Sequence, residues 1–570
     1  MTRLVLDPIS RIDGHLRVEV ELANGAVTDA WTSGTMYRGL ERVLEGRDAR
    51  DAWLIAQRLC GTCGTAHAQA AVRAVERALG LRIPTNARLL RNLLAGTQLV
   101  VDHAAGFYLQ QALDWIDLAS ALTADPGATS SLARSLSDWP NSSAAYFKAI
   151  QQRLGTVLRS SQPGPFANAS WGHPAYVLRP EANLTVAAHY LEALDWRRRI
   201  MRGHVILGGK SPHPQTYLVG GMSLAPEWGG PARPVPGAHL WDLQRQSPSG
   251  LSADGLAELG SLIAEARTFV EQVYLADVLS IMKEYRGWAK IGRGIGHYLA
   301  FGEFPEDDSD RPALALQRGR IMDGDLSGVV AVGEMGVGES VDHSWYTSGA
   351  QDGDLRHPSE GRTEPRYAGP RPPFATLAGF DRYSWVKSPR YEDDPMEVGP
   401  LARLLVSTVS GASDIRNALG DATARLGLEP EGLFSTLGRT VARAVEAQVV
   451  VGRLGAWLGD LRENLASGDL AIADITMSDV ATWPHDAAGW AIGESPRGAV
   501  GHWVSIRDHR IERYQIVDAT TWNGSPRDTR GRRGAMEQAL IGTPVADPDC
   551  PIEILRTIRS FGPCLSCAVH

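Results

Sequence analysis

The sequence predicts an α+β fold that is predominantly helical, with a large central helical bundle and peripheral β-hairpins. Amphipathic segments with apolar residues at helical spacing are far more numerous than segments with strand-like alternation. The longest helical segments cover residues 85–120, 141–158, 179–206, 255–286 and 434–467. The chain has 570 residues, of which 44% are hydrophobic and 21% charged, so it has ample material for a large core.

The first predicted element is a β-hairpin near the N-terminus. Residues 16–21 alternate between apolar and charged side chains, and Asn24-Gly25 is a tight-turn dipeptide. Helical periodicity follows over 48–59 and resumes over 67–79. The Cys-x-x-Cys between these two segments is therefore predicted to lie at or near a helix start.

Pro/Gly-rich or acidic stretches separate the long helical segments, at 225–237, 304–312 and 354–373. We interpret them as surface excursions from one body, since no internal repeat of fixed period is evident. If the first and last cysteine pairs serve one site, residues 60 and 567 must meet, which does not fit independent consecutive domains. We therefore expect a single interlocked domain over residues 1–570.

Net charge and hydropathy argue against several classes of partner. The net charge is -8 and the pI is about 6.0, so the chain has no basic footprint for nucleic acid or anionic lipid. No uninterrupted apolar stretch reaches the ~18 residues of a membrane span, and the N-terminus lacks the apolar core of a secretory signal. A membrane location would thus require a partner.

The cysteines carry the strongest signal. They stand at positions 60, 63, 550, 564 and 567, which does not fit the disulfide framework of a secreted protein. Four of them form two Cys-x-x-Cys pairs. The second pair, with His570, falls within the last seven residues, where chains usually fray. The first pair is the expected partner that holds this end in place.

Two Cys-x-x-Cys pairs suit a soft or borderline metal, because two intervening residues let both sulfurs return to one ion. Structural zinc is the plainest interpretation, but zinc ribbons place their pairs ~15–20 residues apart, and about five hundred residues intervene here. Two separate redox or structural pairs, or coincidence, remain open from spacing alone. His67, one helical turn after Cys63, could hydrogen-bond a ligating sulfur, although a lone His on an apolar face is more often part of the core.

The segments RLCGTCGTAH (58–67) and PCLSCAVH (563–570) resemble the paired signatures of the nickel-iron hydrogenase large subunit. The two-ended cysteine signature is highly specific, and the resemblance spans nearly the whole chain. Its other segments are 36–53, 208–222, 343–346, 383–391, 395–403, 494–503 and 520–528. The resemblance implies an enzyme, the catalytic subunit of a hydrogenase of respiratory uptake type, which cleaves H2 heterolytically into protons and electrons.

The resemblance also implies a metal centre and a second ion. The nickel-iron centre, which includes an Fe(CN)2(CO) group, would be held by four thiolates, the second of each pair bridging to iron: Cys60, Cys63, Cys564 and Cys567. The cyanides would be hydrogen-bonded by Thr520 and the backbone of Pro496 and Arg497. Magnesium or a similar divalent ion would be bound near the C-terminus by Glu41, the Ile516 carbonyl and His570.

Three further matches concern the proton and its surroundings. Arg497, in ESPRG, would place its guanidinium over the metals, although this motif in isolation would indicate a surface Arg in a Pro/Gly turn. Asp102 lies in the middle of a long apolar helix, where a carboxylate needs a partner, and it matches a carboxylate that pairs with this Arg. Asp13, in RIDGH, matches the first proton acceptor beside a nickel thiolate.

The chain departs from the family pattern at four positions. Asp13 replaces the usual Glu and is one methylene shorter, so proton transfer from sulfur would need a water or a moved backbone. Gly562 replaces the usual Asp before the last cysteine pair, which leaves Asp102 to offset the positive charge over the metals. Thr62 stands where Val is common and Gln110 where an apolar residue is usual, so we expect a narrower or more polar path for H2.

The resemblance also implies partners. No spare cysteines remain for iron-sulfur clusters, so an iron-sulfur small subunit is expected to take the electrons. Similarity to uptake enzymes implies membrane association, on the periplasmic or cell-membrane side, through a membrane cytochrome or a quinone-linked subunit; a cytoplasmic location stays open. A dimer of heterodimers is expected. The end at His570 resembles the mature form of relatives, which are made with a C-terminal extension that is cut after this His.

Two alternatives stay within the same family. The first is an H2-sensing member, which has the same site and a signalling partner. The second is a non-catalytic relative of the quinone-site subunit of respiratory complex I. Such relatives have lost the nickel cysteines, whereas all four are present here.

Overall fold

The computed structural model describes residues 2–168, 170–224, 251–309, 312–347, 355–361, 363–369, 376–474 and 479–570. The surface excursion predicted at 225–237 lies outside these residues. Those predicted at 304–312 and 354–373 lie partly outside them.

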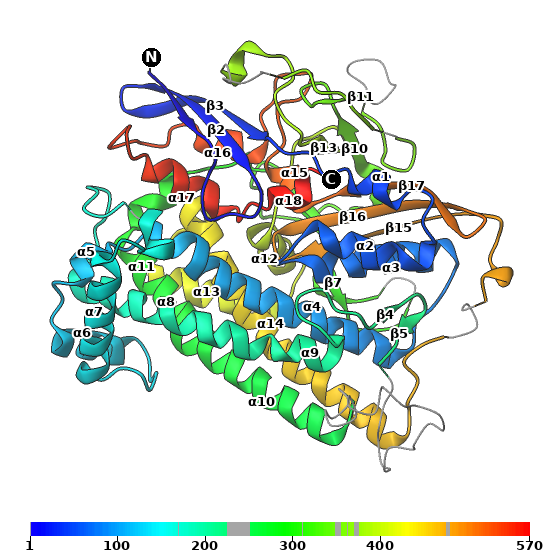
Figure 1. Ribbon diagram of the computed structural model, residues 1–570, viewed down its shortest axis with the longest axis horizontal. Coiled ribbons are helices and arrows are strands. Elements are labelled where there is room, and N and C mark those ends of the chain that lie inside the picture. Colours follow the sequence, from blue (N-terminus) through cyan, green and yellow to red (C-terminus); the bar gives the residue numbers. More distant parts are fainter. Residues whose placement is uncertain are drawn as a thin grey trace.

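Long helices form the centre of the molecule, so the predominantly helical α+β prediction is confirmed (Figure 1). Several predicted helical segments contain two helices, because a short π or 3-10 turn or a single residue interrupts them. The long helices are α4 (Thr85–Gly106), α7 (Ala144–Arg159), α8 (Pro180–Ile200), α10 (Ala253–Phe269), α11 (Leu275–Glu284) and α14 (Thr436–Ser467).

Other helices, most of them shorter, surround this bundle and connect it to the sheets. They are α1 (Leu40–Leu44), α2 (Ala52–Ala56), α3 (Gly64–Ala78), α5 (Leu118–Ala121), α6 (Pro126–Leu136), α9 (Arg202–Gly208), α12 (Pro400–Val409), α13 (Ser413–Leu426), α15 (Ala519–Asn523), α16 (Ala535–Leu540), α17 (Ile552–Ser560) and α18 (Leu565–Ala568).

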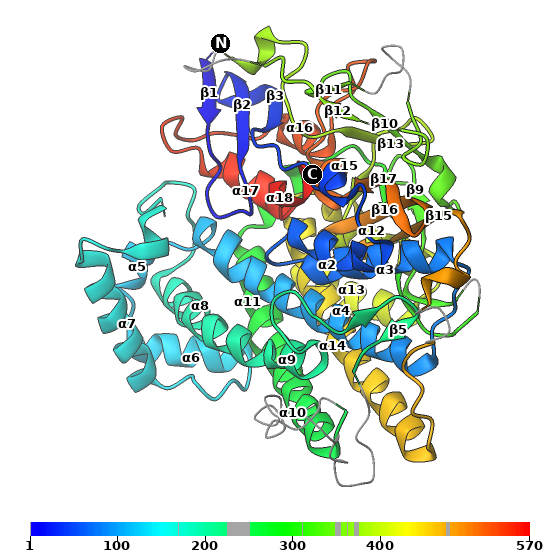
Figure 2. The same cartoon turned by 45° about the vertical axis from the view of Figure 1, so that its right-hand side comes forward.

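Helices α4 and α14 pack side by side in the bundle (Figure 2). At Gly96 of α4, an added Cβ would lie 2.8 Å from Leu454 Cδ2 and 3.1 Å from Trp457 Cζ3. Both distances are shorter than the optimal separation of two carbon atoms, about 3.5–4.0 Å. Glycine at this position therefore allows the two helices to approach closely.

The N-terminal hairpin predicted around Asn24-Gly25 is confirmed. Strands β2 (Leu16–Ala23) and β3 (Ala26–Gly34) are antiparallel, and both turn residues have positive φ, as a type I′ turn requires. A third strand that was not predicted, β1 (Thr2–Leu6), pairs with β2 to give the order β1-β2-β3. Apolar residues of this sheet share a core with α16, α17 and α18, which brings the two ends of the chain together.

A second antiparallel sheet, not predicted from the sequence, lies close to the cysteines. Its order is β15 (Asp486–Ser495), β16 (Gly498–Arg507) and β17 (Arg510–Val517). Helix α3 lies against β15 and β16, where an added Cβ at Gly489 would be 2.3 Å from the Ala74 carbonyl oxygen. Most of β16 is buried, and buried strands lack the alternation that identifies a half-exposed strand in a sequence.

The remaining strands form small sheets in the upper part of Figure 1 and along the bundle. They are β4 (Tyr217–Leu218) with β5 (Gly221–Met222), β7 (Glu303–Pro305) with β8 (Leu314–Leu316), β10 (Val337–Ser340) with β13 (Ser388–Tyr391), β11 (Tyr346–Thr347) with β12 (Glu364–Pro365), and β14 (Glu397–Val398) with β6 (Tyr298–Ala300) and β9 (Gly319–Ile321). In the described ranges, none of the helices combines the length and apolar character needed to cross a membrane.

Gly96→Val is expected to destabilise the protein by about 1–3 kcal/mol, because its methyl groups are forced against Leu454 and Trp457. The matched control is Gly455→Val on α14, where an added Cβ meets nothing within 4 Å. There Val has the higher helix propensity, so stability stays the same or rises slightly. Thermal unfolding measures both effects, and equal melting temperatures would contradict the packing argument.

Candidate metal centre

Two cysteine pairs from opposite ends of the chain meet in one buried cluster. Sγ of Cys60 lies 3.6 Å from Sγ of Cys564, and Sγ of Cys63 lies 3.5 Å from Sγ of Cys567. All four sulfurs lie within 4.8 Å of one another, none is in a disulfide, and the residues are at most 1% exposed. Four thiolates at these separations suit a soft or borderline metal ion.

The cysteines stand where short segments meet helices. Cys63 is the N-cap of α3, so the helix start predicted for the first pair is confirmed, and its backbone N–H donates to Cys60 Sγ at 2.9 Å. Cys564 precedes α18, and its backbone N–H donates to Thr520 Oγ1 at 2.9 Å. These hydrogen bonds fix the backbone around both pairs.

The C-terminal segment is held by the N-terminal motif RIDGH. The Leu565 N–H donates to the Asp13 carbonyl at 2.7 Å. Next to it, Gly14 has a φ of +83°, and an added Cβ would lie 2.6 Å from the Ser566 nitrogen. Glycine is needed for both the φ and the approach. The last residue, His570, is consequently buried rather than frayed.

Arg497 extends over this region from the turn between β15 and β16. Its Nη2 lies 3.0 Å from Asp13 Oδ2, and its Nη1 lies 3.5 Å from Asp102 Oδ2. From the sequence, Asp102 was expected to offset the charge of Arg497 alone; the structure corrects this by adding Asp13. Burial raises the pKa of Asp102 to about 6, although Arg497 acts in the opposite direction.

Thr62 connects Asp13 to a cysteine. Its hydroxyl donates to Asp13 Oδ2 at 3.0 Å and lies 3.2 Å from Cys60 Sγ. Arg497 Nη2 donates to the same hydroxyl at 3.1 Å. The side chain of Thr62 therefore occupies the space between the sulfur and the shortened carboxylate.

His67 lies beside the other cysteine pair. A ring nitrogen of His67, an oxygen of Asp518 and Sγ of Cys567 all lie within 4.8 Å of one another. The opposite ring nitrogen, Nδ1, is 3.1 Å from His502 Nε2. Burial lowers the pKa of His67 to about 4, so the imidazole is neutral.

Of Pro496 and Thr520, both predicted to hydrogen-bond the cyanides, only Thr520 has a donor, because proline has no backbone N–H. Thr520 Oγ1 accepts the Cys564 N–H, which leaves its hydroxyl proton for another acceptor. The Pro496 carbonyl accepts a hydrogen bond from Arg403 Nη2 at 3.1 Å. Arg403 is itself paired with two buried carboxylates, Glu446 at 2.6 Å and Glu494 at 2.7 Å, so it holds the ESPRG turn in place.

The residues predicted to bind a second ion also converge. Glu41 Oε1 accepts the Ile516 N–H at 2.8 Å and lies 3.5 Å from His570 Nε2. The Ile516 N–H faces Glu41, and its carbonyl, the predicted ligand, faces the His570 ring. His570 Nε2 is buried without a hydrogen-bond partner, which fits an absent ligand of the imidazole. Lys387 Nζ, which was not predicted, lies 3.0 Å from Glu41 Oε1.

Gly562, where the family pattern has Asp, faces a second buried guanidinium. An added Cβ at Gly562 would lie 2.6 Å from Arg443 Nη2. Arg443 donates to the Phe561 carbonyl at 2.6 Å, and among the described residues no carboxylate forms an ion pair with it. Burial, together with Arg497 and Arg403, lowers the pKa of Arg443 to about 10, so it stays charged near neutral pH. The space beside Gly562 is therefore filled by a cation.

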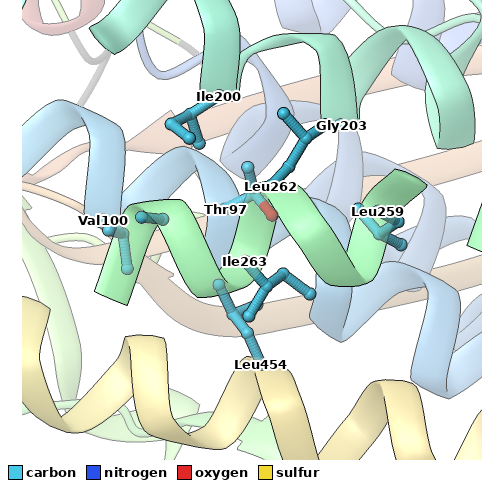
Figure 3. A pocket seen from close by; sticks show the side chains of 9 residues that line it. Thr97, Val100, Ile200, Gly203, Leu259, Leu262, Ile263 and Leu454 are labelled. Atoms are coloured by element: carbon cyan, nitrogen blue, oxygen red, sulfur yellow. The ribbon is translucent and has the colours of Figure 1, made fainter. Parts of the chain in front are cut away.

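An apolar cavity of about 10 Å³ lies in the helical bundle rather than at the cysteines (Figure 3). Side chains from α4, α10 and α14 point into it, among them Val100, Leu259, Ile263 and Leu454. Apart from Thr97 it is lined by apolar residues, so it lacks the two to four polar partners that a buried water needs.

Several residues around this centre were not predicted from the sequence. Most of them lie within or next to the segments that carry the family resemblance. His502 and Asp518 follow ESPRG and precede TTWNGSPRD, and Lys387 lies within SWVKSPRY. Their types gave no signal of their own, because a single His, Asp or Lys between apolar residues has no diagnostic spacing. Arg443 lies in a long helix, where charged residues are usually exposed.

Comparisons with known proteins agree with this geometry. The sequence matches the family described as nickel-dependent hydrogenase over residues 38–570. It is 44% identical to the uptake hydrogenase large subunit of Bradyrhizobium diazoefficiens and 42% identical to the hydrogenase-1 large chain of Escherichia coli, covering 100% of this chain and 95% of each relative. The fold is similar to that of the Ni-Fe-Se hydrogenase from D. vulgaris Hildenborough in the reduced state, with a TM-score of 0.77, 32% identity and full coverage of both chains.

Gly562→Ala is expected to destabilise the protein more than Gly542→Ala. Both glycines have positive φ, +62° and +79°, so each substitution costs about 1–2 kcal/mol of backbone strain. Only the Cβ at Gly562 meets Arg443, and this overpacking adds about 1–3 kcal/mol. Denaturant unfolding of the two variants measures the difference, and equal losses of stability would show that Arg443 moves away freely.

Proposed function

The chain belongs to the nickel-dependent hydrogenase family, and we propose that its four buried cysteines hold the nickel-iron centre at which this large subunit cleaves H2. The protein is the catalytic large subunit of a hydrogenase of uptake type, as its full-length relatives are. The observation that carries the assignment of the centre is the meeting of two Cys-x-x-Cys pairs, about five hundred residues apart, in one buried cluster. A closed structural zinc site would explain the cysteines but not the buried Arg497 and its two carboxylates beside them.

The donor set fits the proposed group. The four cysteine sulfurs, within 4.8 Å of one another, would hold the nickel-iron group as thiolates. The free hydroxyl proton of Thr520 and the Arg497 backbone N–H, which lies 3.3 Å from Ser495 Oγ, would donate to the cyanides of an Fe(CN)2(CO) group, whereas Pro496 has no N–H to donate. When bound, the nickel-iron group would supply Lewis-acid metal ions that polarise H2, so that one hydrogen can leave as a proton.

We propose that Asp13 receives the proton through Thr62. A proton on Cys60 Sγ has the Thr62 hydroxyl at 3.2 Å, and that hydroxyl already donates to Asp13 Oδ2 at 3.0 Å. One proton moves from Sγ to Thr62 Oγ1 as the hydroxyl proton moves to Asp13, so the hydroxyl is unchanged at the end. Thr62 thereby compensates for the methylene that Asp13 lacks relative to Glu.

In the proposal, Arg497 and Asp102 lie over the cysteine cluster on the side of Asp13 and Thr62. The Arg497 guanidinium holds Asp13 and Thr62 in place through Nη2 and pairs with Asp102 through Nη1. Arg497 Nε is buried without a partner, so the side chain retains one N–H for a group in the site. Asp13 and Asp102 hold the Arg497 guanidinium in place over the cysteines. Its positive charge therefore stabilises negative charge that develops at the metal centre.

We propose that magnesium or a similar divalent ion is bound by Glu41, the backbone of Ile516 and His570. A carboxylate oxygen, a backbone carbonyl and an imidazole provide three donors, and water would complete the coordination of such a hard cation. Lys387 competes for Glu41, so the ion would have to share this carboxylate with the ammonium or displace it. The ion would then tie the C-terminal His570 to Glu41, which follows the N-terminal hairpin.

We propose that an iron-sulfur small subunit receives the electrons. The relatives of this chain are named large subunits, which implies a small-subunit partner. Four cysteines are used at the centre and the fifth, Cys550, cannot hold a cluster alone. We further propose a single interlocked domain, a dimer of heterodimers, and attachment to a membrane through a cytochrome or quinone-linked subunit. The uptake type of the relatives supports the membrane link.

Cys567→Ser is expected to abolish nickel binding in the purified heterodimer, because one of the four thiolates that hold the metal is lost. Cys550→Ser is the matched control, since Cys550 lies outside the cluster and contacts Ser170 Oγ at 3.0 Å. Metal analysis and infrared spectroscopy in the CO and CN stretching region measure the outcome. A fully matured wild-type sample that contains nickel but shows no such bands would refute the proposed centre.

Thr62→Val is expected to lower H2 oxidation by about 10²-fold or more, the usual contribution of a positioned proton-transfer group. Asp13→Asn should cause a comparable loss without loss of nickel, because neither residue is a metal ligand in the proposal. The longer carboxylate of Asp13→Glu can approach Cys60 directly, so adding it to Thr62→Val should restore part of the activity. Rates of H/D exchange and nickel content measure these effects, and full activity of Thr62→Val would remove Thr62 from the proton path.

A further inference from the structure

A chain of three buried side chains leads away from the cysteine cluster. Tyr514 Oη lies 2.8 Å from His502 Nδ1, and His502 Nε2 lies 3.1 Å from His67 Nδ1. His67 Nε2 then faces Asp518 Oδ1 at 3.6 Å, beside Cys567. All three side chains are at most 1% exposed, so bulk solvent does not reach their polar atoms. Neither His502 nor Tyr514 has a place in the proposed function.

The fold fixes the geometry of this chain. His502 and Tyr514 lie on adjacent antiparallel strands, β16 and β17, where His502 is opposite Ile516 and Tyr514 is opposite Val504. They are therefore diagonal neighbours on the same face of the sheet. Helix α3 packs against that sheet and places His67 next to His502. Three separate elements thus bring the polar atoms into one line.

Each contact in this series of side chains needs one donor and one acceptor. The hydrogen bonds can therefore run from Tyr514 to His67 or from His67 to Tyr514. In the first, Tyr514 donates to His502 Nδ1, His502 Nε2–H donates to His67 Nδ1, and His67 carries its remaining proton on Nε2. In the second, all donors are reversed, and His67 Nε2 has a lone pair instead of a proton. The contact between the two ring nitrogens, 3.1 Å apart, needs one donor and one acceptor, so only one of the two facing atoms can be protonated.

The surroundings select the first direction. Within the described part of the chain, His502 is the sole hydrogen-bond partner of the Tyr514 hydroxyl, so a reversed chain would leave that proton without an acceptor. At the other end, Asp518 Oδ1 is buried without a partner, and Cys567 Sγ is a second acceptor. A lone pair on His67 Nε2 would face these two acceptors, whereas an N–H can donate to them.

We propose that Tyr514 and His502 are positioning residues that keep the proton of His67 on Nε2, so that His67 presents an N–H to Cys567 Sγ and Asp518. This inference rests on the proposed function, in which Cys567 is one of the cysteines that would hold the metals. An N–H donor withdraws electron density from the sulfur, as hydrogen bonds to metal-ligating sulfurs do elsewhere. This series of hydrogen bonds would therefore let Tyr514 change the electron density at the metals, although Tyr514 contacts none of the metal-binding cysteines.

Tyr514→Phe tests the proposal in the purified heterodimer, because it removes only the hydroxyl that sets the direction. With that proton absent, His67 can adopt the other tautomer and the sulfur becomes more electron-donating. The CO and CN stretching bands are then expected to shift to lower frequency, while nickel content is retained. Tyr298→Phe is the matched control, since Tyr298 is equally buried and its hydroxyl has no partner in the described chain. Wild-type bands in Tyr514→Phe would overturn the proposal.

His502 provides a second, independent comparison. In His502→Gln, the amide can accept from Tyr514 and donate to His67 Nδ1, so the direction is kept and the bands should stay near those of the wild type. His502→Leu has a similar volume and no polar atoms, so its bands should shift as in Tyr514→Phe. Equal shifts in the Gln and Leu variants would show that packing, not proton direction, is responsible.

A neutron crystal structure of the wild-type heterodimer reads the protons directly. The expected positions are His502 Nε2 and His67 Nε2, and a proton on His67 Nδ1 would overturn the proposal whatever group the cysteines hold. Absence of CO and CN bands from the wild type would instead refute the proposed centre, so the two failures are distinguishable.

Discussion

Four thiolates gathered in a buried space repel one another unless cations lie among and around them, and the structure around the cysteines responds to this constraint. The proposed metals would be one source of positive charge. Arg497 is a second, and Arg443, which fills the space beside Gly562, is a third. Because the two guanidiniums are buried, Arg497 is held by carboxylates and Arg443 by a backbone carbonyl. The centre is thus part of a wider network of buried charge.

Bringing the four cysteines together also requires that the C-terminal segment be held in place. The last cysteines can reach the first pair only if the C-terminal segment is held on both sides. RIDGH does this through its backbone, and the core shared by the N-terminal sheet and α16–α18 supports it. His570 beside Glu41 adds a third attachment. Residues at the very end of the chain therefore become as buried as those of the bundle.

The departures from the family pattern are easier to understand in pairs. The short Asp13 stands beside Thr62, whose hydroxyl spans the distance to Cys60. Gly562 stands beside Arg443, whose guanidinium leaves no room for a side chain. In each pair, the second residue occupies the space that the first leaves. The site therefore keeps its packing while its charge shifts: a carboxylate is absent at Gly562, and Asp13 joins Asp102 as a partner of Arg497.

The sequence by itself determined the helical character, the N-terminal hairpin and the identity of the four cysteines, because periodicity, turn residues and ligand spacing are local properties. It also placed Asp102 and Arg497 near the centre through resemblance. Only the tertiary structure decided what surrounds them. The sheet β15–β17 left no clear alternating pattern because β16 is largely buried, yet it carries the Arg497 turn, His502, Tyr514 and Ile516. Contacts such as Arg443 with Gly562 join residues more than a hundred positions apart, and no local pattern records that distance.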